Sequence, residues 1–358
     1  MKTSRFLTLA GVVLATSVLG LYAFRAPVSV WLAKRLVAQK LAVDVKAELP
    51  DGLHVGLCGA GSPFPDDRRG GPCTVVLAGQ KLFVFDAGNA SARNLGKMGF
   101  NHGQIDAIFL THFHSDHIDG LGELMLQRWV NGAHPQAVPV YGPPGVQKVV
   151  GGLNEAYAQD QHYRVAHHGE ATLPSAGSGG LAQPFDATSP QGLVVFRDAG
   201  VEVMAFPVDH APVHPAVGYR ISYKGRAMVL SGDTRPSKTV AQQAQGVDLL
   251  VHEALSSPLV QLIGDAASKA GRPHVQKLMS DIVDYHSSPE QAAQIAQDAK
   301  VGYLLLSHIA PPLPIPGMQN AFLGDAAHIY SGPLRVGVDG DFISLPAASK
   351  EIRVGRRF

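Results

Sequence analysis

The stretch Thr-His-Phe-His-Ser-Asp-His occupies residues 111–117 and follows an apolar run at residues 105–110. That run has the length of a buried strand, so the motif begins where a strand passes into a loop. Strand side chains alternate with a period of two, and the first two histidines therefore point to one side, while the last two polar residues lie past the turn. Four side chains that can bind metal within six residues predict a metal site, and a polar loop with solvated histidines is the alternative. The four are His112, His114, Asp116 and His117.

The spacing His112-x-His114-x-Asp116-His117 resembles the signature of the metallo-β-lactamase superfamily of dinuclear hydrolases. Further matches extend from about residue 52 to residue 345, and the resemblance is closest to the ribonuclease Z-like and arylsulfatase-like branch. It implies an α/β (α+β) fold of four layers, αββα, in which two sheets are flanked by helices. The strand ends that carry the ligands would then share one edge of the sandwich.

The resemblance also implies two metal ions. One ion would take His112, His114 and a third imidazole, which is His210 at the end of a strand-like run or, four residues on, His214. The second ion would take Asp116, His117 and His308, and Asp233 resembles the family's bridging carboxylate. Imidazole nitrogens and carboxylate oxygens without thiolate suit zinc first, with manganese or iron as alternatives. The expected ligands are His112, His114, Asp116, His117, His210, Asp233 and His308.

Two adjacent ions would lower the pKa of a bound water and neutralise charge on the reacting oxygens. The segments His252-Glu253-Ala254 and His286-Ser287-Ser288 resemble ribonuclease Z motifs in which the histidine protonates the leaving oxygen and the carboxylate orients it. The expected catalytic residues are therefore Asp116, His286 and Glu253. Alternatively, His286 caps a surface turn. Alkoxide and phenoxide leaving groups need a positioned acid more than a lactam nitrogen does, so these motifs favour phosphate or sulfate esters.

Two further aspartates lie close to the metal motif in the sequence. Asp86 follows a strand-like run, and in the family an aspartate at this place supports the metal loop; an ordinary turn residue is the alternative. Asp119 can favour the start of the next helix, or can orient a ligand imidazole as an outer carboxylate.

Hydrophobic periodicity predicts the regular elements. Helices are expected at residues 118–130, at residues 146–157 and from residue 289, where Ser288 and Gln291 can form a capping box around Pro289. Strands are expected at residues 53–57, 74–77, 81–85, 105–110, 138–141, 193–197, 201–208, 217–223, 226–231, 247–251, 301–306, 335–338 and 342–345.

The N-terminal part differs in composition from the rest. Lys2 and Arg5 precede an uncharged apolar segment at residues 6–24, which has about the 20 residues needed to cross a bilayer. We expect residues 1–25 to be a signal peptide or, by preference, a signal anchor, and the protein to be exported, either periplasmic or anchored on the extracytoplasmic side. Residues 26–50 are expected to form an amphipathic helix and linker, and residues 51–358 the hydrolase domain.

The composition of the chain indicates which binding partners to expect. With a formal net charge of +1, the 358-residue chain has no strong attraction to polyanions, whereas its 16 histidines favour metal ligation. Residues 165–192 are rich in Gly, Ser, Ala and Pro and predict a mobile insertion near the mouth of the site. They lack the basic cluster with which the ribonuclease Z arm grips transfer RNA, which places that substrate in doubt. Cys58 and Cys73 are either disulfide-bonded or free thiols.

The leading hypothesis is a dizinc hydrolase acting on a phosphodiester or sulfate ester, either a small molecule or another anionic ester. A lactonase or β-lactamase of the same fold is the second hypothesis, and a metal-binding, membrane-associated protein without catalysis is the third. Contact with the membrane would occur through the N-terminal helix. Nucleic acid remains a candidate partner, although the sequence shows no basic arm that would bind it. The sequence leaves open whether the protein forms a dimer. Specificity is expected to depend on residues 165–192 and 311–331.

Overall fold

A computed structural model describes residues 17, 20, 22, 24–39 and 44–358 of the chain. The chain divides into two compact units, Met1–Val45 and Lys46–Phe358. In the first unit residues 24–39 are helical, as expected for part of residues 26–50. Most of the predicted signal or anchor segment lies outside the described residues. Within the described part, we find no helix that is both long and apolar enough to cross a bilayer.

The second unit contains two facing mixed sheets. In its described residues the first sheet has the order β15-β14-β1-β2-β3-β4-β5-β6 and the second has the order β13-β12-β11-β10-β9-β8-β7. The strands of the first sheet are β1 (Gly52–Gly59), β2 (Cys73–Ala78), β3 (Lys81–Phe85), β4 (Ile105–Phe109), β5 (Val138–Gly142), β6 (Gly180–Pro184), β14 (Asp341–Pro346) and β15 (Arg353–Arg356). The strands of the second sheet are β7 (Leu193–Asp198), β8 (Val201–Pro207), β9 (Val217–Tyr223), β10 (Arg226–Leu230), β11 (Leu249–Leu255), β12 (Leu304–Ala310) and β13 (Leu334–Val336).

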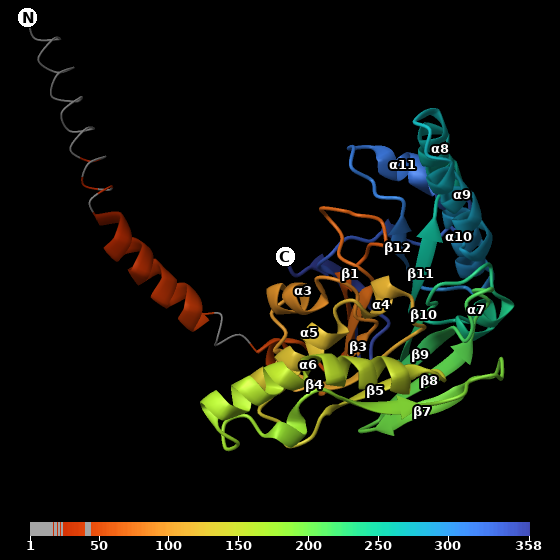
Figure 1. The fold of residues 1–358 in the computed structure, drawn as a ribbon. Coiled ribbons are helices and arrows are strands. Elements are labelled where there is room, and N and C mark those ends of the chain that lie inside the picture. Colours follow the sequence, from red (N-terminus) through yellow and green to blue (C-terminus); the bar gives the residue numbers. More distant parts are fainter. Residues whose placement is uncertain (1–16, 18–19, 21, 23, 40–43) are drawn as a thin grey trace, which may run out of the picture. The chain divides into compact units, whose positions relative to one another are not determined.

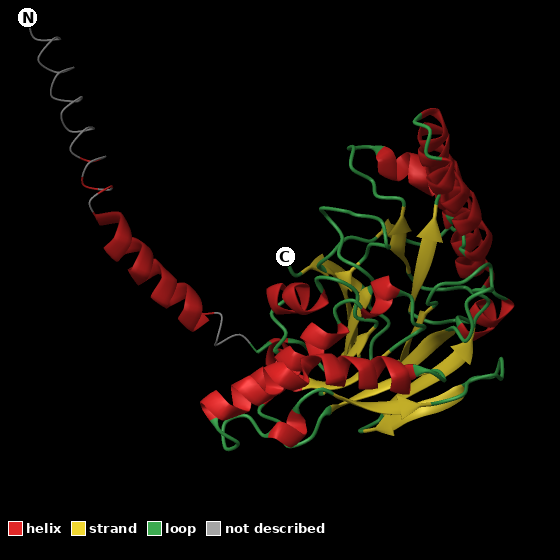
Figure 2. Ribbon diagram, viewed as in Figure 1, coloured by secondary structure: helices red, strands yellow, loops and turns green. Residues whose placement is uncertain are grey.

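Helices cover the outer faces of both sheets (Figures 1 and 2). Preceding or flanking the first sheet are α2 (Val45–Glu48), α3 (Ser91–Lys97), η1 (His102–Gln104), α4 (Ser115–Ile118), α5 (Leu121–Gly132), α6 (Val146–His168) and η2 (Ser175–Gly177). Associated with the second are α7 (Lys238–Gln243), α8 (Ser257–Lys269), α9 (Pro273–Asp281), η3 (Ile282–Tyr285), α10 (Pro289–Asp298), α11 (Met318–Leu323) and α12 (Ala326–Ile329). The expected arrangement of two sheets flanked by helices is confirmed.

The main core lies between the sheets and contains a cluster of aromatic rings. Phe85 stacks on Phe109 with ring centroids 4.9 Å apart, and Tyr219 from the second sheet meets Phe85 edge-on at 5.2 Å. The Tyr219 hydroxyl also donates a 2.5 Å hydrogen bond to the carbonyl of Leu110, immediately before the histidine motif. A buried polar group keeps its place because leaving it unpaired is costly. The second sheet is thereby joined to the end of β4 at the point where the motif starts.

The expectation for residues 165–192 is wrong. The first four of these residues complete α6, and residues 180–184 form β6, which pairs in parallel with β5 at the edge of the first sheet. Leu173 and Ala187 are buried, and Phe185 packs on the main core. Small residues here allow close packing: a Cβ added at Gly177, for example, would lie 1.8 Å from the His134 carbonyl oxygen.

Candidate metal centre

The predicted ligands come from different strand ends and converge. His112 and His114 follow β4, His210 lies between β8 and β9, and Asp233 follows β10. The other three predicted ligands do not lie just after a strand, as was expected. Asp116 and His117 belong to the short helix α4, and His308 lies within β12 with a left-handed backbone (φ 49°). A backbone hydrogen bond from Val217 to the Thr111 carbonyl, 3.0 Å long, holds β9 against the motif.

One group of side chains comprises His112, His114, His210 and Asp233, whose candidate ligand atoms all lie within 4.8 Å of one another. The His112 Nε2 and His114 Nδ1 atoms are 3.0 Å apart, and His210 Nε2 is 3.4 Å from the same His114 nitrogen. His210 is buried, whereas His214 is exposed and lies outside the group. The fold therefore brings His210, and not His214, to the centre.

A second group comprises Asp116, His117 and His308. The His308 Nε2 atom lies 3.3 Å from Asp116 Oδ2, and His117 Nε2 lies 3.6 Å from the same oxygen. Asp233 Oδ2 is 3.2 Å from both of these histidine nitrogens and 3.8 Å from His112 Nε2. This one carboxylate oxygen therefore faces both groups, as a bridging ligand would.

The donor set fits divalent metal ions. His117 is buried with its Nδ1 hydrogen-bonded to Asp86, and its Nε2, which faces the centre, has no hydrogen-bond partner in the described structure. Several ring nitrogens lie within 4 Å of one another, and they cannot all be satisfied by donating protons to each other. A cation bound by nitrogen and carboxylate oxygen satisfies them together, and this ligand chemistry suits zinc.

The pKa shifts of the side chains in the centre also favour the binding of a metal ion. Burial lowers the pKa of His112 well below its ordinary value, which leaves the ring in the neutral form that binds metal. Burial also acts to lower the pKa of His308, but the Asp233 and Asp116 carboxylates overcome it and raise that pKa to about 9. Burial alone would raise the pKa of Asp233, yet His308, His117 and His112 hold it well below its usual range. A bound cation would replace these protons as the partner of the carboxylates.

Outer partners fix the ligand imidazoles. His117 Nδ1 donates to Asp86 Oδ2 (2.9 Å), and the Asp86 carboxylate also accepts from the backbone nitrogen (2.8 Å) and hydroxyl (2.9 Å) of Thr111. His112 Nδ1 donates to that hydroxyl (3.0 Å). His210 Nδ1 donates to the Tyr285 carbonyl (2.9 Å). Such partners set the ring orientation and the tautomer.

Asp86 thus supports the metal loop, as predicted from the resemblance. The idea that Asp119 orients a ligand imidazole is wrong: Asp119 is the C-cap residue of α4, and among the described residues the carboxylate hydrogen-bonded to the outer nitrogen of a predicted ligand histidine is that of Asp86. Thr111 and Tyr285 were not foreseen as supporting residues. The position of Thr111 directly before the motif could have indicated its supporting role. No feature of the sequence indicates that the Tyr285 carbonyl would accept a hydrogen bond from a ligand histidine.

Glu253 and His286 meet beside the second group. Glu253 Oε1 accepts from His286 Nδ1 (3.2 Å) and from the backbone nitrogens of Ser287 (2.8 Å) and Thr234 (3.2 Å). The His286 ring lies parallel to His308 with centroids 5.3 Å apart, and with Asp233 and His308 it forms a third group of metal-competent atoms within 4.8 Å. His286 therefore belongs to the site and does not simply cap a surface turn.

A groove of about 360 Å³ opens at the centre. Its lining includes His114, Asp116, Asp233, His286 and His308 at one end and the side chains of residues 63–65, 278–279, 282 and 285 elsewhere. The loops predicted to decide specificity, residues 165–192 and 311–331, do not contribute to this lining. Part of the groove wall comes instead from α9 and η3, which carry Leu278, Met279, Ile282 and Tyr285.

Fold and site together define a metal-dependent hydrolase of the metallo-β-lactamase type. The family model for the beta-lactamase superfamily domain matches residues 83–309. Ribonuclease Z of Mycolicibacterium gilvum is 36% identical over 289 residues, which cover 80% of this chain and 94% of that protein. Ribonuclease Z of Mycobacterium bovis is also 36% identical, over 80% of this chain and 96% of its own length.

Solved structures agree on the fold. The short form of human tRNase Z superposes with a TM-score of 0.57 at 22% identity, over 82% of this chain and 99% of that one. The metallo-beta-lactamase fold protein YhfI from Bacillus subtilis gives the same TM-score at 18% identity, over 82% of this chain and 100% of that one. The chain belongs to the beta-lactamase superfamily and, within it, to the ribonuclease Z-like metal-dependent phosphodiesterases.

Proposed function

We propose that the protein is a dizinc phosphodiesterase whose two ions are held by the two groups of side chains and bridged by Asp233. The observation that carries this proposal is the position of Asp233 Oδ2, within 3.9 Å of imidazole nitrogens of both groups. The proposed ligands are His112, His114, His210 and Asp233 for one ion and Asp116, His117, His308 and Asp233 for the other.

When bound, the two ions would supply water of lowered pKa and positive charge for the reacting oxygens. Asp116 lines the groove and is placed to accept the proton of the attacking water. His286, at the same end of the groove, is placed to protonate the leaving oxygen, and Glu253 fixes the orientation of its ring. This division of roles gives one site both a base and an acid.

The two histidines of the β8–β9 connection provide a matched test. His210→Ala removes a proposed ligand, and we expect it to lose bound zinc and to lower kcat/KM for bis-p-nitrophenyl phosphate by more than about 100-fold, since even outer partners of ligands are worth 10- to 100-fold. His214→Ala changes an exposed ring of the same connection and should keep both zinc content and rate. Metal content is measured by mass spectrometry on protein loaded under identical conditions. Full activity and full zinc content in His210→Ala would refute the proposed site.

Maturation of transfer RNA is the second candidate, because the relatives at 36% identity are named ribonuclease Z. Against it, residues 165–192 contain no lysine or arginine, whereas affinity for a polynucleotide depends mainly on cations that neutralise phosphates. Cleavage of a precursor transfer RNA at a rate well above that of bis-p-nitrophenyl phosphate would establish this candidate. A sulfate ester, a lactone and a lactam complete the substrate panel.

We also propose that the protein functions outside the cytosol. Support comes from the disulfide between Cys58 and Cys73, because such bonds persist mainly in oxidising compartments. Fractionation of cells that produce the full chain, with the thiols trapped by alkylation at lysis, tests this. Recovery in the cytosol with both thiols alkylated would contradict it.

A further inference from the structure

The groove beside the metal centre has two chemically different ends. One end carries the imidazoles and carboxylates of the centre, and the other is lined by apolar side chains. These are Pro63, Phe64, Pro65, Leu278, Met279 and Ile282. Tyr285 and His286 also line the groove, with ring centroids 4.7 Å apart, and Tyr285 lies against the His210 ring of the centre. A volume of about 360 Å³ is in the range of sites that enclose small ligands.

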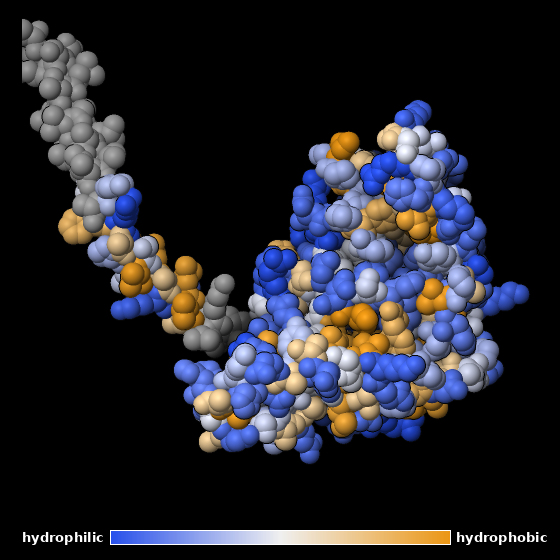
Figure 3. All heavy atoms as spheres, viewed as in Figure 1, coloured by the Kyte–Doolittle hydropathy of each residue, from blue (hydrophilic) through white to orange (hydrophobic). Residues whose placement is uncertain are grey.

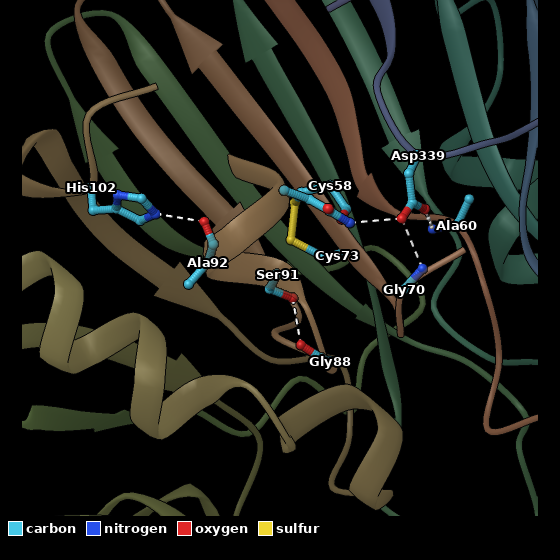
Figure 4. The surroundings of a disulfide bond; sticks show 10 residues. Cys58, Ala60, Gly70, Cys73, Gly88, Ser91, Ala92, His102 and Asp339 are labelled. Carbon is cyan, nitrogen blue, oxygen red and sulfur yellow. Dashed lines mark hydrogen bonds between the residues drawn. A yellow bond between two sulfur atoms is a disulfide. The ribbon is translucent and has the colours of Figure 1, made fainter. Parts of the chain in front are cut away.

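The first apolar wall is a loop that the fold holds in place. Asp339 accepts hydrogen bonds from the backbone nitrogens of Ala60 (3.0 Å) and Gly70 (2.8 Å), at the two ends of this loop (Figure 4). The disulfide between Cys58 and Cys73 closes the same segment. Phe64 is therefore carried on a preorganised loop, which reduces the ordering cost of binding against it.

The second apolar wall is α9, continued by η3. This helix packs on α8, where Gly264 faces Met279: a Cβ at Gly264 would lie 3.4 Å from Met279 Cβ, in ordinary van der Waals contact. Met279, Ile282 and Phe64 pack on a small buried cluster formed by Leu255, Val260 and Ala310, which joins the two walls. Leu278 remains 54% exposed at the rim. Figure 3 shows apolar surface beside α9 on this face.

The charges in the groove indicate what it does not bind. Among the described residues that line it, none is a lysine or an arginine, and the ionisable side chains are those of the metal centre and Tyr285. A polynucleotide path would need cations along the phosphates or a series of stacking rings. An apolar group attached to one phosphate needs neither, because its binding comes from removing apolar surface from water.

We propose that the groove binds the alkyl portion of a phosphate ester, with the phosphate at the metal centre and the alkyl chain between Phe64 and α9. This deepens the proposed function and rests on it. Aliphatic side chains and a flexible methionine suit an extended chain, to which they can adapt. Because His286 lines the same groove beside His308, an ester bound in this way would have its alkyl oxygen near the proposed acid.

A homologous series of probes tests the proposal on the zinc-loaded protein. Calorimetric Kd values are measured for methyl, butyl, hexyl and octyl phosphate, with thymidine 5′-phosphate as the nucleotide. Because each buried methylene contributes a roughly constant free energy of transfer, we expect Kd to fall about fourfold per methylene over the first several carbons. Leu278→Gln and Ile282→Gln should flatten this dependence. Leu262→Gln, an apolar residue of α8 that is 64% exposed and outside the lining, should keep it.

The outcomes separate the two proposals. A Kd that does not change with chain length, or a dependence that survives both groove substitutions, overturns the alkyl site. Tighter binding of thymidine 5′-phosphate than of octyl phosphate overturns it in favour of a nucleotide site. The dizinc phosphodiesterase is judged separately, by zinc content and by turnover of bis-p-nitrophenyl phosphate.

Discussion

At the scale of single residues, the centre depends on side chains in unusual backbone conformations. Asp86 and His308 both have positive backbone φ angles, 57° and 49°, which residues other than glycine rarely adopt. Asp86 is retained there by hydrogen bonds from three donors, the backbone nitrogen and hydroxyl of Thr111 and Nδ1 of His117. His308 is held inside β12, whose pairing with β11 shifts register just after Ser307. Local strain at a functional site persists when the surroundings determine the conformation.

His286 gives a prediction at this scale. In His286→Ala the leaving oxygen loses its proposed acid, and we expect kcat/KM for diphenyl phosphate to fall by about 10²- to 10⁴-fold. For bis-p-nitrophenyl phosphate the loss should be much smaller, because p-nitrophenoxide leaves without needing a proton. Steady-state kinetics on both esters measure the difference.

Zinc content is the control for this substitution, because His286 could also contribute a ligand atom with Asp233 and His308. Equal losses on both esters with normal zinc would mean that His286 does not protonate the leaving group. Unchanged turnover of a lactone by the same variant, together with faster lactone than ester hydrolysis, would support the lactonase hypothesis.

At the scale of elements, His112, His114, His210 and Asp233 lie on short connections, and the regular elements around them fix their positions. The N-terminus of α10 is an example: Ser288 accepts from the Gln291 backbone nitrogen (3.2 Å), and the Gln291 side chain accepts from the Ser288 backbone nitrogen (2.8 Å). The preceding residue, Ser287, is bonded to Glu253, and its carbonyl accepts from Leu255 of β11 (2.8 Å). The cap therefore positions the segment that carries His286.

Ser288→Ala should cost about 1 kcal/mol of stability, because it removes one partner of the capping box. The expected measurement is a lower midpoint in urea denaturation with an unchanged slope. Ser256→Ala is the matched control, since Ser256 is the N-cap of α8 without a capping hydrogen bond. Equal destabilisation by both substitutions would show that the capping box contributes nothing specific.

At the scale of the whole molecule, two sheets face each other and the metal centre lies at one edge. Bonds across the sandwich connect β9 to the histidine motif, and Asp339 connects the C-terminal strands to the loop after β1. The disulfide adds a covalent closure across 15 positions of sequence, between the end of β1 and the start of β2. This closure belongs to the same loop as Phe64, so stability and the shape of the groove are connected.

Replacing both cysteines by alanine should cost about 2 to 4 kcal/mol, as expected for a loop of this length. Thermal unfolding of the oxidised protein and of the Cys58→Ala/Cys73→Ala variant measures the loss. A reducing agent should lower the Tm of the parent protein toward that of the variant and leave the variant unchanged. A parent Tm that is insensitive to complete reduction, confirmed by thiol counting, would contradict this prediction.

The sequence by itself predicted most of the strands and most of the side chains that the fold gathers into the two metal-competent groups. Alternation and apolar runs are local patterns, so β3 and β9 were predicted to the residue, and polar residues at strand ends marked the centre. The capping box of α10 was predicted for the same reason, because all of its atoms lie within four residues.

Only the tertiary structure decided the choice of His210 over His214, the disulfide, the role of Asp86, and the walls of the groove. Each of these depends on the distance between segments that are far apart in the chain, such as Phe64 and α9. Such distances follow from how the sheets and helices close on one another, and local periodicity carries no information about them.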